Sequence, residues 1–283
     1  MNSRVQWLLV TGGVLAMSAW APGAPGRIVV ANDEWTLSDT GFVAPSDGGI
    51  FAVRVAAWFM RGKPGNFLAY SGNLGLVQSQ LGAAMKAAGH TWTVSTTTPF
   101  TVTNLLSFDA VFVCGPVSGF APNNQVLIEY VAAGGCVYLA GGTGQVDEAT
   151  AWSPFLSAYG LRFANGFNGI SGHVPISSPH PIMQGIDTLY QLNGSSIIDL
   201  EPANAANTIV ATHSTGAGLY AVYSTPCVGD INDDGLVNTA DLTLLLLRFG
   251  QAVVPGSLGD INGDGGVNTT DLTLLLARFG QPC

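Results

Sequence analysis

The sequence predicts an α/β protein with a doubly wound, mostly parallel sheet, followed by a small helical module near the C-terminal end. Two observations predict this architecture. Short apolar runs alternate with helical patterns between Arg27 and Ser224, which is the order of elements in a parallel sheet covered by helices on both faces. Beyond that region one segment occurs twice, and each copy ends in leucines with helical spacing.

Five short runs rich in β-branched or aromatic residues are the expected strands. They are residues 27–31, 66–70, 91–95, 109–114 and 136–140. Helical patterns occur over 50–60, 74–88, 123–133 and near 148–159, and later strands are expected near 207–214 and 218–224. Because the early runs are apolar throughout, we expect strands that are buried on both faces of the sheet.

The duplicated segment opens with oxygen-bearing side chains at alternate positions. The copies begin at Gly229 and Gly259, and each contains a loop of twelve residues. Positions 1, 3, 5, 9 and 12 are Asp230, Asn232, Asp234, Asn238 and Asp241 in the first loop, and Asp260, Asn262, Asp264, Asn268 and Asp271 in the second. Position 6, where such a loop turns sharply, is Gly235 or Gly265, and position 7, which supplies a backbone carbonyl, is Leu236 or Gly266. The spacing predicts two Ca²⁺ ions, one in each loop.

The composition of this segment favours a metal-binding module over an acidic disordered tail. Residues 228–283 hold seven Asp and two Arg, a net charge of −5 out of −9 for the whole chain. Two Ca²⁺ ions would nearly neutralise that charge, and without them the segment is expected to be partly unfolded. Apolar residues recur at i, i+3, i+4 and i+7 after each loop and are expected to form one helical face; they are Leu242, Leu245, Leu246, Phe249, Leu272, Leu275, Leu276 and Phe279.

Paired loop-and-helix segments that lack the entering helix of an ordinary EF-hand resemble a type I dockerin. The resemblance covers most of residues 226–283, and Asp at position 12 is typical of dockerins. It implies a module with near two-fold symmetry that docks onto a cohesin domain of a scaffold protein. The partner contacts that it implies are Thr239, Ala240, Arg248, Thr269, Thr270 and Arg278. A calcium-dependent tail without a cohesin partner is the alternative.

The N-terminal residues have the pattern of an export signal, which we assign to residues 1–24. Arg4 precedes an apolar stretch from Val5 to Trp20, and cleavage is expected after Ala21 or near Ala24. Later segments are not apolar for long enough to predict a permanent membrane span. We therefore expect a secreted protein, extracellular or periplasmic.

Four cysteines suit an oxidising compartment. Cys227 and Cys283 bracket the repeat module, and a disulfide between them would stabilise it by roughly 3–4 kcal/mol by reducing the entropy of the unfolded chain. Cys114 and Cys136 end and begin neighbouring expected strands, where either a buried pair or two free thiols would fit.

The larger domain, which we assign to residues 27–225, resembles class I glutamine amidotransferase-like domains. These have a flavodoxin-like fold that is shared with trehalose-utilisation-type proteins. The resemblance rests on FDAVFVCGP, NNQVLIEYVAAGG, CVYLAGG and HPIMQGI, which begin at residues 108, 123, 136 and 180. The family's nucleophilic cysteine is replaced here by Gly141 to Gly144, and no His-x-Glu pair follows, the nearest histidine being His213. The resemblance therefore implies the fold without the amidotransferase triad.

Polar or reactive groups at the carboxyl ends of the expected strands are the candidates for chemistry. They are Asn32, Asp33, Glu34, Ser71 to Asn73, Cys114 and Gly141 to Gly144. Asp33 and Glu34 beside Trp35 could be an acid pair at a carbohydrate-facing cleft, but a solvated loop is favoured because adjacent carboxylates point in different directions. For Cys114 a packed thiol is favoured over a nucleophile, and for GGTG a plain turn over an anion cradle.

The histidines and tryptophans have simpler interpretations. His173 and His180 lack identifiable metal partners and are expected to be loop residues. The aromatic rings of Trp35, Trp58, Trp92 and Trp152 are expected in the core, with a sugar-stacking platform as the alternative.

The sequence thus predicts a calcium-binding tail that docks a secreted protein onto a cohesin-type or cell-surface partner. The α/β domain has no intact triad and is expected to bind a ligand or a partner. A hydrolase acting on polysaccharide, which rests only on the cargo that dockerins usually carry, and a structural surface protein are the alternatives. A charged fraction of 10% without a basic patch argues against nucleic-acid binding.

Overall fold

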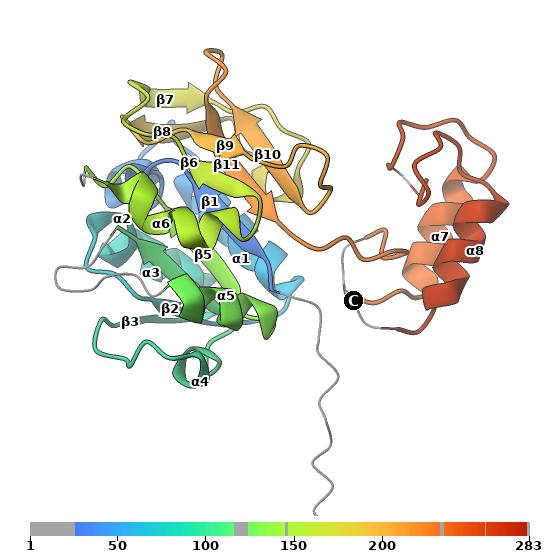
Figure 1. The fold of residues 1–283 in the computed structure, drawn as a ribbon, viewed down its shortest axis with the longest axis horizontal. Coiled ribbons are helices and arrows are strands. Elements are labelled where there is room, and N and C mark those ends of the chain that lie inside the picture. Colours follow the sequence, from blue (N-terminus) through green and yellow to red (C-terminus); the bar gives the residue numbers. More distant parts are fainter. Residues whose placement is uncertain (1–25, 116–123, 145–146, 233–234, 258, 282–283) are drawn as a thin grey trace, which may run out of the picture.

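The computed structural model describes residues 26–115, 124–144, 147–232, 235–257 and 259–281. These residues form an α/β domain on a nine-stranded sheet and a C-terminal module of two helices (Figure 1). The predicted class, a mixed and mostly parallel α/β sheet followed by a helical C-terminal region, is confirmed. The predicted export signal lies outside the described residues. No described helix is both long and apolar enough to cross a membrane.

Parallel strands form one half of the sheet, and they are the five runs predicted from the sequence. Their spatial order is β3 (Thr91–Val94), β2 (Asn66–Ala69), β4 (Ala110–Cys114), β5 (Cys136–Ala140) and β1 (Ile28–Ala31). If β2, β3, β4 and β5 are renumbered 1 to 4 in chain order, their spatial order is 2-1-3-4, as in a flavodoxin-like sheet. The fifth place is taken by the N-terminal strand β1, which pairs in parallel with β5.

The other half of the sheet is antiparallel and starts at β1. Its strands are β11 (Gly218–Tyr223), β9 (Ile197–Asp199), β6 (Leu161–Phe163) and β10 (Asn207–Thr212), the last of which pairs with β11. The loop 213–217 between β10 and β11 is too short for a parallel crossover, so this pair must be antiparallel. A separate two-stranded sheet contains β7 (Ser171–Pro175) and β8 (Thr188–Leu192).

Helices cover both faces of the large sheet (Figure 1). One face packs against α1 (Gly48–Met60) and α3 (Ser79–Ala87), and the other against α5 (Asn124–Ala132) and α6 (Glu148–Ser157). The shorter helices are η1 (Glu34–Leu37), η2 (Asp39–Phe42), α2 (Leu74–Val77), α4 (Val102–Leu105) and η3 (Pro181–Met183). Strand β1 sends alternate side chains into the two layers and is fully buried, which explains its uninterrupted apolar sequence.

The helix predicted over 74–88 is two helices, because tertiary contacts interrupt it at Gln78. The backbone of Gln78 is extended, with φ −71° and ψ 168°. Its side chain accepts a hydrogen bond from the backbone N–H of Asp39 at 2.7 Å, and the Asp39 carboxylate accepts the N–H of Gln80 at 2.9 Å. Asp39 thereby caps the start of α3, which the apolar pattern of the sequence could not indicate.

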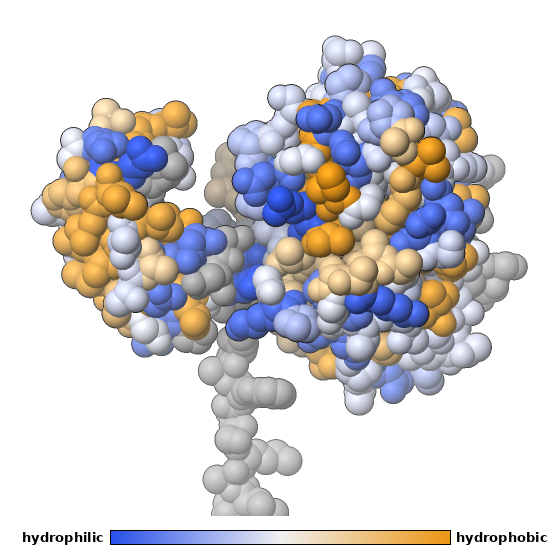
Figure 2. Space-filling model, turned by 180° about the vertical axis from the view of Figure 1, so that it is seen from behind, coloured by the Kyte–Doolittle hydropathy of each residue, from blue (hydrophilic) through white to orange (hydrophobic). Residues whose placement is uncertain are grey.

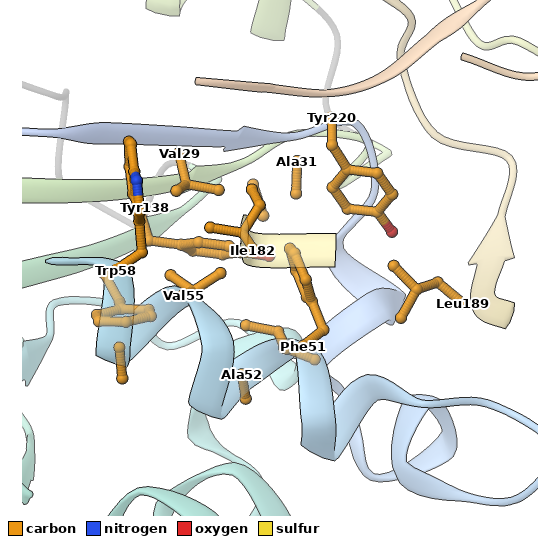
Figure 3. Close-up of a cluster of buried hydrophobic side chains, with 14 of the residues drawn as sticks. Val29, Ala31, Phe51, Ala52, Val55, Trp58, Tyr138, Ile182, Leu189 and Tyr220 are labelled. Carbon is orange, nitrogen blue, oxygen red and sulfur yellow. The ribbon is translucent and has the colours of Figure 1, made fainter. Parts of the chain in front are cut away.

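Aromatic rings fill the layer between α1 and the sheet. Phe51 packs edge-on against Tyr220 and Tyr138, at ring-centroid distances of 5.0 and 6.5 Å, and Figure 3 shows its ring directed from α1 toward the sheet. Trp58 and Trp152 are buried in the two layers, and Trp92 packs on Phe112 at 4.9 Å. The expectation of a core position is met for Trp58 and Trp152, whereas Trp92 and Trp35 are only half-buried.

Replacing Phe51 with alanine should destabilise the α/β domain by about 3–5 kcal/mol, because a fully buried ring would leave a cavity among other rings. Urea unfolding at saturating calcium measures the loss. The neighbouring Ile50 is 44% exposed, so Ile50→Ala is the matched control and should cost less than about 1 kcal/mol. Equal losses for the two variants would contradict the assignment of this layer as the core.

Candidate functional sites

The C-terminal module pairs its two repeats by the same backbone hydrogen bonds. Its helices are α7 (Thr239–Arg248) and α8 (Thr269–Arg278). Gly250 N–H donates to the Val267 carbonyl at 2.7 Å, and thirty residues further on Gly280 N–H donates to the Val237 carbonyl at the same distance. The duplicated sequence therefore folds into two halves, each of which ties the end of its helix to the other half's loop. The module's buried core is also symmetric and consists of Val237, Leu245, Val267 and Leu275.

Position 12 of each loop is a fully buried carboxylate that is held by backbone N–H groups. Asp241 accepts the N–H of Ile231 at 2.7 Å on Oδ1 and that of Asn238 at 2.9 Å on Oδ2. Asp271 makes the equivalent bonds to Ile261 and Asn268, at 2.7 and 2.8 Å. Because the asparagine at position 9 caps the helix in return, each aspartate is fixed at the mouth of its loop.

Position 1 of the second loop is also enclosed by backbone donors. Asp260 is 3% exposed and accepts N–H groups from Gly263, Asp264, Gly265 and Gly256 at 2.8 to 3.2 Å. Burial alone would raise the pKa of this carboxyl, but the hydrogen bonds outweigh it and lower the pKa, so Asp260 is anionic at neutral pH. Asp230 is held similarly by Gly235 N–H at 2.8 Å.

The donor set of the loops fits a hard cation. In the second loop Asn262 donates to Asp264 at 2.7 Å, and Asn268 donates to the Gly266 carbonyl at 3.1 Å, which brings positions 3, 5, 7 and 9 together. A carboxylate that accepts N–H groups keeps further lone pairs for a metal. His, Cys, Asp and Glu alone form no metal-holding group of three among the described residues, because the loops rely on Asn and backbone oxygens. Asp234 lies outside the described residues.

The outer surface of the module is apolar, which corrects one prediction. Leu245 and Leu275 are buried, but Leu246 and Leu276 are 53% and 52% exposed. Phe249 and Phe279 are 41% and 40% exposed, so the last two positions of the expected helical face point outward. Each helix has only the other helix and the loops to pack against, and Figure 2 shows the apolar surface that results on the module. All six predicted partner contacts are exposed; they are Thr239, Ala240, Arg248, Thr269, Thr270 and Arg278.

Cys227 at the start of the module is disulfide-bonded. Its predicted partner Cys283 lies outside the described residues, so the pairing stays a prediction. Cys114 and Cys136 are free and buried, and they lie at opposite ends of the paired strands β4 and β5. Burial raises the pKa of the Cys114 thiol well above its usual value, which keeps it neutral and argues against a nucleophile.

In the α/β domain, Asp33 is a buried structural carboxylate, which corrects the favoured prediction of a solvated loop, and it is not part of an open acid pair. It is fully buried and accepts the N–H groups of Trp35 at 2.8 Å and Leu192 at 2.6 Å. These bonds fasten the end of β1 to β8. Burial, the largest effect, outweighs the hydrogen bonds and raises the pKa of Asp33 to about 6.

Glu34 belongs to a second polar cluster that joins the ends of β1, β2 and β4. The Asn73 amide donates to the Glu34 carboxylate, and the Asn73 N–H donates to the Ser71 hydroxyl at 2.9 Å. Ser71 in turn donates to the Cys114 carbonyl at 3.1 Å. Burial raises the pKa of Glu34. The predicted candidates after these three strands are therefore brought together, but they bind one another.

Glu148 is a site residue that the sequence analysis missed. It begins α6, is 5% exposed, and accepts Gly142 N–H at 2.7 Å and the Thr143 hydroxyl at 2.8 Å. The GGTG turn therefore does bind an anion, but the anion is the protein's own side chain. The sequence did contain a signal for this pairing, because Glu148 lies at the start of a predicted helix only four residues after the glycine-rich turn. At Gly142 φ is +74°, and a Cβ there would lie 2.7 Å from the Gly194 Cα, so this position of the turn is closed to a side chain.

His180 and His213 lie in loops, but His173 lies in strand β7, which corrects the prediction of a loop residue there. His180 packs edge-on against Trp58 at 5.5 Å and caps η3. His173 packs against Tyr190 at 5.4 Å, and His213 shares a hydrogen bond of 2.9 Å with the Thr215 hydroxyl.

Asp33 should give the domain a stability that falls as the pH rises. Its folded pKa of about 6 exceeds the ordinary value of 3.8 for an aspartate, so the folded state holds the proton more tightly. Its contribution is complete below pH 3.8 and is lost as the pH rises through about 6, a change of about 3 kcal/mol. We expect the unfolding free energy of the wild type, relative to Asp33→Asn, to fall by that amount between pH 4 and 7 at constant free calcium. A difference independent of pH would contradict the assignment.

Comparison with known proteins identifies only the C-terminal module. The family model described as dockerin type I domain matches residues 228–280. Among solved structures, a type II cohesin-dockerin domain from Bacteroides cellolosolvens is 36% identical over 20% of this chain and 92% of that chain, with a TM-score of 0.19. No curated protein matches the chain. Residues 228–280 therefore form a type I dockerin domain.

Proposed function

We propose that residues 228–280 bind two Ca²⁺ ions and dock this chain onto a cohesin-type domain of a scaffold or cell-surface protein. The observation that carries the proposal is the repeated loop, in which a buried aspartate at position 12 is held by the same three backbone N–H groups in both copies. The ligands are those predicted from the sequence, with Leu236 and Gly266 providing carbonyl oxygens at position 7. Calcium would supply the positive charge that organises these carboxylates.

The exposed apolar rows on α7 and α8 support a docking role. A module with a core of four buried side chains leaves Leu246, Phe249, Leu276 and Phe279 uncovered, which is a large apolar fraction for so small a surface. Arg248 and Arg278 lie beside them and can pair with acidic groups on a partner. The two faces differ in detail, because Leu247, which is 65% exposed, corresponds to Ala277 in the second repeat.

The α/β domain is the cargo of this attachment, and we propose that it binds a ligand. Its carboxylates at the strand ends are buried and committed to backbone or amide donors, so no described pair is arranged for glycoside hydrolysis. The dockerin domain and the disulfide-bonded Cys227 support a location outside the cytoplasm, as does the export signal expected at residues 1–24.

Asp241→Asn and Asp271→Asn should each remove one calcium site, because either change removes a charge from position 12 of its own loop. Calorimetric titration of the full chain is expected to give two ions for the wild type, one for each variant and none for the double variant. Asp187→Asn, at an exposed position of the α/β domain, is the control and should leave two. A stoichiometry unaffected by Asp241→Asn would contradict the proposed ligand set.

Docking should require calcium and one intact helix face. Against cohesin domains from the same source, we expect Arg248→Ala or Arg278→Ala alone to weaken binding less than about tenfold, since the other face remains. The double variant should lose more than about a hundredfold, and a chelator should abolish binding. Surface binding measurements with the full chain test this. Tight calcium binding without affinity for any cohesin would overturn docking and leave the metal sites standing.

A further inference from the structure

A cavity of about 340 Å³ opens beside the start of α6, and it shares Glu148 with the turn described above. Its lining includes Asp147, Glu148, Asn165, Phe167 and Ser195. It lies at the carboxyl-end edge of the sheet, since Glu148 is bound to the turn after β5 and Ser195 N–H donates to the Asn32 carbonyl after β1 at 2.8 Å. This is the edge where open α/β sheets bind ligands.

Unpaired polar groups are concentrated around the loop that carries Ser195. Asn32 is fully buried, yet neither its Nδ2 nor its Oδ1 has a hydrogen-bond partner, and a Cβ on Gly194 would lie 2.8 Å from that Nδ2. The side-chain amide nitrogen of Asn168, whose backbone N–H donates to the Gly194 carbonyl, is also buried and unpaired. Each such group costs about 1–3 kcal/mol unless something satisfies it. These two amides are buried close to the loop that carries Ser195 but do not line the cavity, whose own polar side chains include Asp147, Glu148, Asn165 and Ser195.

The chemistry of the lining selects against anions. Two carboxylates, Asp147 and Glu148, border the cavity, and its described lining contains no Lys, Arg or His. Asn165 and Ser195 add groups that can both donate and accept hydrogen bonds. Phe167 is 51% exposed, so its ring offers a flat apolar face at the rim. Hydroxyl groups can satisfy carboxylates, amides and a serine together, while the C–H face of a ring can pack on Phe167.

We propose that this cavity binds a small neutral polyhydroxylated ligand of the size of one or two sugar rings. Its volume lies at the lower end of the range of small-molecule sites, roughly 300–1,000 Å³. The proposal rests on the ligand-binding role proposed for the α/β domain, and it is independent of calcium and of docking.

The test is a calorimetric and NMR titration of the full chain, at saturating calcium, with glucose, galactose, xylose and their β-1,4-linked disaccharides. Spermidine and citrate are the cationic and anionic probes. We expect saturable binding of at least one neutral sugar and neither charged probe. Absence of sugar binding up to about 10 mM, or preferential binding of spermidine or citrate, would overturn the proposal.

Two variants locate the site. Phe167→Ala and Ser195→Ala should each weaken sugar binding about fivefold or more, through lost stacking and a lost hydrogen bond. Leu106→Ala, at a side chain 48% exposed on α4's C-cap, is the matched control and should bind as the wild type does. Sugar binding that neither variant weakens would place the ligand elsewhere and refute this site. Cohesin binding of Phe167→Ala should be unchanged, which separates this test from that of docking.

Discussion

Buried carboxylates that accept backbone N–H groups are the interaction on which both parts of this molecule depend. Asp241 and Asp271 organise the two loops of the C-terminal module, and Asp33 and Glu148 join strands, turns and a helix in the α/β domain. Removing a carboxylate from water is costly, and several N–H donors offset that cost only if the backbone is held in one conformation. In the loops, the same interaction therefore fixes the carboxylates where a cation could bind. At the strand ends of the sheet, it occupies the polar groups that a ligand could otherwise contact.

Because these carboxylates are buried and hydrogen-bonded within the protein, the described polar residues at the strand ends of the α/β domain do not form a hydrolytic site. The edge after β1, β2, β4 and β5 is where a ligand would be expected, but Asp33, Glu34 and Glu148 occupy its donors. A cavity is present to the side, between α6 and the loop that carries Ser195. There the side chains of Asn165 and Ser195 and the exposed ring of Phe167 provide what the closed edge lacks.

The C-terminal module shows how duplication creates a binding surface. Two closely similar halves exchange backbone hydrogen bonds and bury four side chains, and too little protein remains to cover the outer helix faces. The leucines and phenylalanines at those faces are therefore exposed in the free module, and a partner can cover them. Because the repeats differ at Leu247 and Ala277, the symmetry is close but the two faces are chemically distinct.

The sequence by itself determined the five parallel strands, the duplicated loop-and-helix segment and the type I dockerin, because these depend on local spacing: apolar runs, helix stops and polar side chains at fixed intervals. It did not indicate the break at Gln78, the exposure of Leu246 and Phe249, or the pairing of Glu148 with the GGTG turn. Only the tertiary structure decided these, since each depends on which distant residue packs or donates there. The position of β1 beside β5 has the same origin: apolar strands fit any central place in a sheet, and their neighbours are chosen by the packing of the whole domain.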